Sequence, residues 1–92
     1  MSIGTLRTNT LNAATAAKDA GLIDQAQFAR MTDGTVSLND VRTARELATN
    51  HAGEEKGDLA SNLYNAIAAQ NNAQGVLTNI AEAVRDRNAR KP

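Results

Sequence analysis

The sequence predicts an all-α fold, a small bundle of about five helices in one domain spanning residues 1–92. Three observations support this prediction. Alanine, the best helix former, supplies 18 of the 92 residues. Apolar residues recur every three or four positions along most of the chain, and glycines and capping residues divide these stretches. Because Leu, Ile, Val and Phe together supply only 17 residues, we expect a thin core.

The first predicted helix spans about residues 9–20. It ends at Gly21, where a left-handed residue commonly closes a helix. Residues 2–8 contain several Thr and Asn, which are weak helix formers, so this segment is expected to fray.

The second and third helices each follow a residue that caps helices well. Asp24 precedes an apolar pattern that reaches Met31, and Ser37 precedes the most regular amphipathic pattern, which stops at Gly53. Residues 53–57 are charged or glycine and include no apolar side chain, so they are predicted to form a flexible connector.

Asp58 caps a fourth predicted helix, whose apolar stripe continues to Ile67. The polar stretch 70–75 ends in glycine and predicts a loop or a helix break. An apolar stripe over 76–84 then predicts a fifth helix, and the basic tail 86–92 is expected to fray. The expected arrangement is a lead-in helix followed by two helix–loop–helix units. The predicted centre of the domain comprises Phe28, Met31, Val36, Leu38, Val41 and Leu47.

The first helix–loop–helix unit contains four residues at a fixed spacing: Gly34, Val36, Ser37 and Asp40. They resemble the second half of an EF-hand loop, with its turn glycine, β-branched residue, hydroxyl group and closing acidic residue. The resemblance implies that Asp33 and Asp40 are the metal ligands. The first half departs from the family, because Ala29 and Met31 stand at ligand positions and neither can coordinate calcium.

Residues 70–78 repeat this pattern faintly, with Gly75, Leu77 and Thr78 at the matching spacing and amides in place of carboxylates. Calcium requires roughly six to eight oxygen ligands, which neither segment offers. The resemblance therefore implies at most weak binding. No cofactor is predicted, and calcium is the ion to test.

The sequence predicts no catalytic site. His51 is the only histidine, and it lies near the end of a predicted helix, where imidazole interacts favourably with the helix dipole. Phe28 and Tyr64 are the only aromatic residues, which argues against base stacking and against a ring-lined pocket. The absence of cysteine excludes disulfides and thiolate metal sites. The apolar runs are too short for a membrane span.

These features favour a non-enzymatic protein–protein interaction or regulatory module, with a protein partner or self-association. The candidate partner-binding residues are Leu63, Ile67, Leu77, Ile80 and Val84. One alternative is a calcium-responsive EF-hand-like protein. Another is a small helix-turn-helix DNA-binding protein over residues 24–47, with Arg42 and Arg45 on the recognition helix. The zero net charge disfavours nucleic acid as a partner.

The sequence leaves the location open between the cytoplasm and export without a cleaved signal peptide. The start is rich in Thr, Asn, Ser and Ala, cysteine is absent and the core is thin. This composition is similar to that of bacterial proteins secreted by specialised machines. The similarity predicts that residues 2–17 are dispensable for folding.

Overall fold

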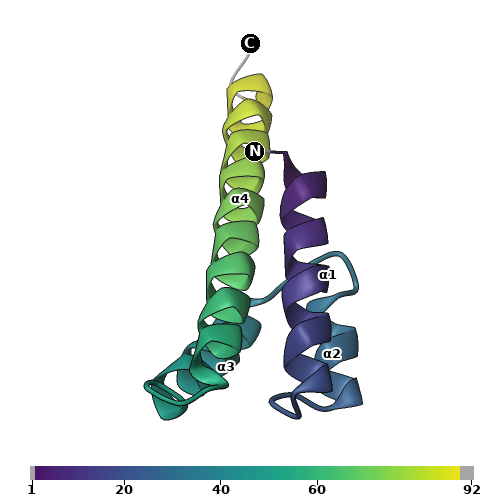
Figure 1. Cartoon of the computed structure of the whole chain (residues 1–92). Coiled ribbons are helices and arrows are strands. Elements are labelled where there is room, and N and C mark those ends of the chain that lie inside the picture. Colours follow the sequence, from purple (N-terminus) through teal and green to yellow (C-terminus); the bar gives the residue numbers. More distant parts are fainter. Residues whose placement is uncertain (1, 90–92) are drawn as a thin grey trace.

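A computed structural model describes the backbone of residues 2–89 and the side chains of residues 2–75. The chain is all-α, as predicted, with α1 (Ile3–Asp19), α2 (Gln25–Met31), α3 (Leu38–Asn50) and α4 (Gly57–Ala89). Helices α1 and α4 lie side by side and run in opposite directions (Figure 1). Helix α4 also packs along α3, and α2 packs on α1, so α4 is the element that joins the two sides of the bundle.

Helix α1 begins at Ile3, several residues earlier than predicted. The Ser2 hydroxyl accepts a hydrogen bond from Thr5 N at 3.2 Å and caps the first turn. The predicted end is confirmed. Gly21 has φ 80°, and Leu22 N donates to Ala17 O at 2.9 Å, the bond that closes a Schellman motif.

One face of α1 belongs to the interior. Its buried residues recur every three or four positions: Leu6, Thr10, Ala14 and Ala17. This burial argues against the expectation that residues 2–17 are dispensable for folding, because their removal would expose the side of α4 that they cover.

Helices α2 and α3 begin at their predicted caps, and both caps are reciprocal. The Asp24 carboxylate accepts from Gln27 N at 2.7 Å, while the Gln27 side chain accepts from Asp24 N at 3.0 Å. Ser37 and Asp40 exchange the same pair of bonds at 3.1 and 3.0 Å. Each capping box satisfies two backbone groups that a helix end otherwise leaves unpaired.

The prediction of a loop or break at 70–75 is wrong. Helix α4 is continuous from Gly57 to Ala89, so residues 2–89 form four helices and the second helix–loop–helix unit does not form as predicted. Gly75 lowers helix propensity but does not terminate this helix, and the amides before it are held by contacts described below.

Residues 51–56 form successive turns and bends, and Gly57, the last residue of the predicted connector 53–57, is the first residue of α4. Glu54 N donates to His51 O and Gly57 N donates to Glu54 O, each at 3.0 Å. Gly53 has φ 82°, and a Cβ atom on Gly57 would overlap the carbonyl oxygen of His51. Both glycines are therefore required by the geometry of this junction. Its flexibility stays a prediction.

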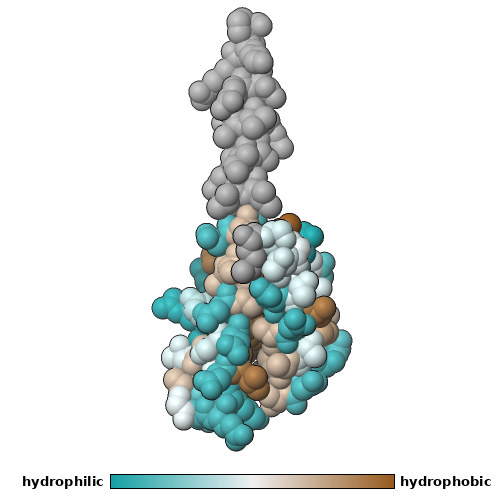
Figure 2. Space-filling view, turned by 45° about the horizontal axis from the view of Figure 1, so that its top comes forward, coloured by the Kyte–Doolittle hydropathy of each residue, from teal (hydrophilic) through white to brown (hydrophobic). Residues whose placement is uncertain are grey.

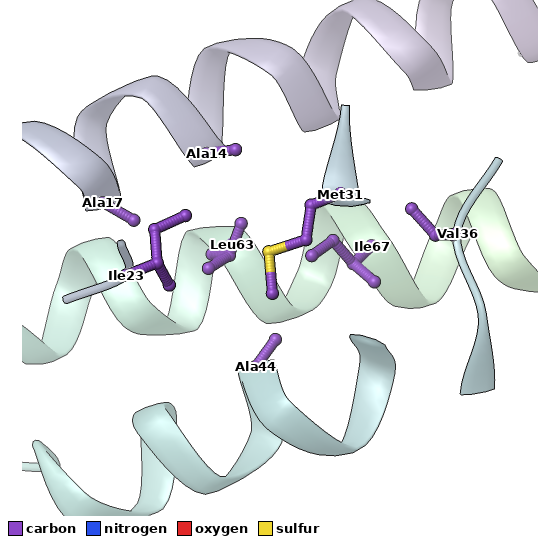
Figure 3. Close-up of a cluster of buried hydrophobic side chains, with 8 residues drawn as sticks. All are labelled: Ala14, Ala17, Ile23, Met31, Val36, Ala44, Leu63 and Ile67. Carbon is purple, nitrogen blue, oxygen red and sulfur yellow. The ribbon is translucent and has the colours of Figure 1, made fainter. Parts of the chain in front are cut away.

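Figure 3 shows the core, which lies where all four helices meet. Leu63 and Ile67 of α4 are fully buried, and Met31 lies between α4 and Ala44 of α3. Small alanines on α1 and α3 allow these helices to approach α4 closely, so few large side chains fill the interior.

The predicted centre is correct for Met31 and Val36, which are buried, whereas Phe28, Val41 and Leu47 pack at its edge. The assignment of Leu38 to the centre is wrong, because 57 % of this residue is exposed. It is the first residue of α3, directly after the Ser37 cap, and the buried face of the helix starts two positions later at Asp40.

Candidate interaction surface

A groove lies between α1 and α4. It consists of two adjoining depressions of about 370 and 520 Å³. Asn9, Asn65 and Ala66 line both depressions, so they mark the middle of the groove. We refer to this feature as the α1–α4 groove. Its remaining lining residues are Leu6, Asn12, Ala13, Ala16, Leu59, Asn62, Ala69, Asn72 and Ala73.

Small side chains at helical spacing shape the floor of the groove. Ala66, Ala69 and Ala73 follow one another on α4. From α1, Ala13 and Ala16 line the first depression with Ala66, and Leu6 lines the second with all three alanines of α4. Beneath them the two helices touch, since the buried Thr10 hydroxyl donates to Ala66 O at 3.4 Å. Close contact below and short side chains above leave an open depression along the junction of the two helices.

Five asparagines border the groove, and none of its lining residues is charged: Asn9, Asn12, Asn62, Asn65 and Asn72. All five are exposed. Figure 2 views the molecule from the side on which α1 and α4 lie in front, and it shows pale-brown side chains interspersed with hydrophilic ones over this surface. The groove is neutral and bordered by carboxamides.

No charged side chain of α1 or of the first turn of α4 lines the groove. Arg7 Nε donates to Gly34 O at 2.9 Å, and Lys18 Nζ lies 4.9 Å from the centre of the Phe28 ring. Neither of these partners lines the groove. From residue 59 to residue 75, α4 contains no charged residue. A surface patch of this size usually carries several charges, so the neutrality is a distinctive property of this face.

A second feature is a clamp of side-chain amides that holds the loop between α2 and α3. Gln74 accepts from Val36 N at 3.0 Å and donates to Val36 O at 2.8 Å, pairing with the main chain as a neighbouring strand would. Asn71 Nδ2 adds a longer bond to Val36 O at 3.4 Å. These bonds satisfy both polar backbone groups of a residue whose side chain is buried.

Gln70 extends this clamp into the interior. Its side chain is 1 % exposed, and its Nε2 donates to Gly34 O at 3.3 Å and to Gln74 Oε1 at 3.0 Å. Gly34 has φ 105°, and its carbonyl also receives the Arg7 bond. Gln70 Oε1 is buried without a hydrogen-bond partner in the described chain. We call Gln70, Asn71 and Gln74 the amide clamp.

The two predicted metal ligands, Asp33 and Asp40, both serve the local backbone. Asp33 Oδ1 accepts from Thr35 N at 3.0 Å, and Asp40 Oδ2 accepts from Ser37 N at 3.0 Å. Asp33 is exposed whereas Asp40 is largely buried. Within the described residues, no group of three or more acidic, histidine or cysteine residues is arranged to hold a metal ion. Calcium binding at these two residues stays a prediction.

His51 is the C-terminal cap of α3, where its N–H donates to Leu47 O at 3.0 Å. Its Nδ1 lies 2.9 Å from Glu54 Oε2, within ion-pair distance, but the two groups are not aligned as a hydrogen bond. The histidine thus lies against a carboxylate of the turn that joins α3 to α4.

The predicted partner-binding residues divide into two groups. Leu63 and Ile67 have no exposed surface, because α1, α2 and α3 cover that side of α4; their assignment to a partner surface is therefore corrected to the core. The others, Leu77, Ile80 and Val84, lie outside the residues whose side chains the structure describes.

The elements proposed for DNA recognition are present as α2, a loop and α3, and Arg42 and Arg45 are both exposed on α3. Their role in nucleic-acid binding stays a prediction. Among the described residues, no helix is long and apolar enough to cross a membrane.

Comparison with protein-family models, curated proteins and solved structures finds no match to this chain. The α1–α4 groove and the amide clamp were not predicted from the sequence. The spacing of amide residues in the sequence nevertheless indicates each of them. Asparagines at positions 62, 65 and 72 lie three and seven residues apart, and glutamines at 70 and 74 lie four apart, so each set shares a helix face.

Proposed function

We propose that this chain is a non-enzymatic protein–protein interaction module that receives a helix in the α1–α4 groove. The observation that carries the proposal is the combination of an apolar alanine floor, a border of carboxamides and the absence of charge among the lining residues. Interfaces between proteins are depleted of charged residues at their centres. An open groove between two helices suits an elongated partner better than a compact small molecule, whose pockets are usually enclosed.

The chemistry of the groove restricts the partner. An alanine floor admits a helix that presents small side chains, because two helix backbones approach closely only where side chains are short. A Lys or Glu pressed into this groove would lose water without meeting an opposite charge. The expected partner segment is therefore an uncharged helix face with small and amide side chains.

Site-specific crosslinking tests this proposal. A photo-crosslinking amino acid replaces Asn62 in the groove or, as the control, Asn50 at the exposed end of α3, in cells that produce the protein. We expect adducts from position 62 only, mapped by mass spectrometry to an uncharged helical segment and suppressed by Asn12→Arg. Equal adducts from both positions, or adducts on a charged segment, would contradict the proposal.

A second proposal is that residues 28–40 form an EF-hand-like unit that binds calcium through Asp33 and Asp40. Its test is whether calcium changes the stability lost on substituting either aspartate.

A further inference from the structure

We infer that the partner of the α1–α4 groove is a second copy of this chain, which docks the same face about a twofold axis. This inference rests on the proposed function, since it names the helix that the groove receives. A twofold contact brings one surface patch against an identical patch, so the patch must complement itself. The α1–α4 groove meets this requirement in charge and in hydrogen bonding, and its middle indicates which residues would lie near the axis.

Charge is the first requirement. A patch with a net positive or negative charge repels its own copy, and the described groove residues carry none. The two cations of α1 are engaged away from the groove, Arg7 with Gly34 and Lys18 over Phe28. At the share of charged residues in the whole chain, 22 %, twelve lining residues would carry about two or three charges. Their absence removes the repulsion that normally keeps identical surfaces apart.

Hydrogen bonding is the second requirement. A carboxamide carries two N–H donors and one acceptor oxygen, so an asparagine can pair with another asparagine. A border made of carboxylates or of ammonium groups alone lacks that property. Asn9 already makes an interaction within the chain, so Asn12, Asn62, Asn65 and Asn72 are the exposed carboxamides that can exchange bonds with those of a second copy, which limits the desolvation cost of contact.

The middle of the groove indicates where the twofold axis would pass. Asn65 and Ala66 line both depressions of the groove and so lie near its middle. In a twofold contact, residues at the middle of the patch lie near the axis and meet their own copies. Ala66 and Ala69 leave room there for a second α4 to approach, and Asn65 stands at the border beside them. Asn65 is thus expected to face Asn65 of the other copy.

The strength of the contact follows from its extent. The groove follows α4 from Leu59 to Ala73, a length of about 20 Å. A patch of this length lies at the low end of specific interfaces, so we expect a dissociation constant of about 1 to 100 μM. Concentrations on both sides of this range are needed to observe it.

A charge-exchange experiment on the full chain tests the inference. Asn65→Arg and Asn65→Glu each place like charges against each other across the axis, and sedimentation equilibrium should show both variants as monomers where the wild type is dimeric. An equimolar mixture should recover a dimer that contains one copy of each variant. Asn50→Arg, which adds the same charge on exposed α3, should sediment as the wild type does. Circular dichroism checks that each variant remains helical.

A wild type that stays monomeric up to about ten times the upper end of that range would overturn the inference. Single variants that still dimerise, or a mixture that stays monomeric, would overturn it as well. The proposed function is decided separately. If the crosslinker at position 62 captures a helix of a different protein, the groove remains an interaction site and only the second copy is refuted; if it captures nothing, the groove itself fails.

Discussion

Helix α4 carries carboxamides on two faces that meet different surroundings. On one face the amide clamp, Gln70, Asn71 and Gln74, is bonded to the backbone of the loop between α2 and α3. On the other, Asn62 and Asn65 border an open groove. The carboxamide group thus stabilises the fold where backbone N–H and C=O groups lie opposite it. Where no such groups lie opposite, it forms part of the exposed surface. The helical spacing of polar residues indicates which of them share a face. Whether that face is bonded within the fold or exposed depends on the groups that pack against it.

The face of the amide clamp should be the costly one to alter. Gln74→Leu keeps helix propensity similar but leaves Val36 N without its amide acceptor and removes the shorter bond to Val36 O. We expect the free energy of unfolding, measured by urea denaturation, to fall by about 2 kcal/mol. This value allows for the partial exposure of Gln74 to water. Asn72→Leu, two residues away in the groove, should change it by less than about 0.5 kcal/mol. Equal losses at the two positions would contradict the distinction between the faces.

The loop held by the amide clamp has a second fastener in the capping box of α3, which allows the EF-hand resemblance to be tested. Asp40→Ala removes the carboxylate bond to Ser37 N and should lower the free energy of unfolding by about 1 kcal/mol. Asp33→Ala removes one exposed turn bond and should cost less than about 0.5 kcal/mol. If both residues serve only the local backbone, the loss that each substitution causes should be the same with and without millimolar calcium in urea denaturation. A loss that grows when calcium is added would favour metal ligation instead.

Local signals in the sequence predicted several features of the fold. Asp24 and Ser37 were identified as caps because a short oxygen-bearing side chain before an apolar pattern can accept a bond from the first turn. Gly21 was identified as a helix end because only glycine adopts positive φ without strain. These features depend on residues close together in the chain, so no knowledge of packing was required.

Features that depend on distant contacts were missed. The stretch 70–75 contains helix-weakening Asn and Gly, which favoured a loop, but Gln70 and Gln74 bond Gly34 and Val36, more than thirty residues earlier in the chain. Those bonds make a polar helix face compatible with the interior. Leu63 and Ile67 were assigned to a partner because apolar stripes do not indicate whether the covering surface belongs to the same chain or another. The α1–α4 groove likewise requires two helices to be placed side by side.

A small effect of the opposite sign is expected at Gly75, which lies on α4 one residue beyond the amide clamp. It is exposed, and a Cβ atom built there meets no other atom within 4 Å. Gly75→Ala should therefore raise the free energy of unfolding by about 0.5 to 1 kcal/mol, because alanine is the better residue inside a helix. Gly57→Ala is the matched control in the same helix. Its Cβ would overlap His51 O, so it should lower stability by about 1 to 3 kcal/mol. Both values come from thermal or urea unfolding followed by circular dichroism. If Gly75→Ala destabilises the protein as well, α4 bends or breaks at this position in solution; the two carboxamide faces would then end there, and a second helix–loop–helix unit would again have to be considered.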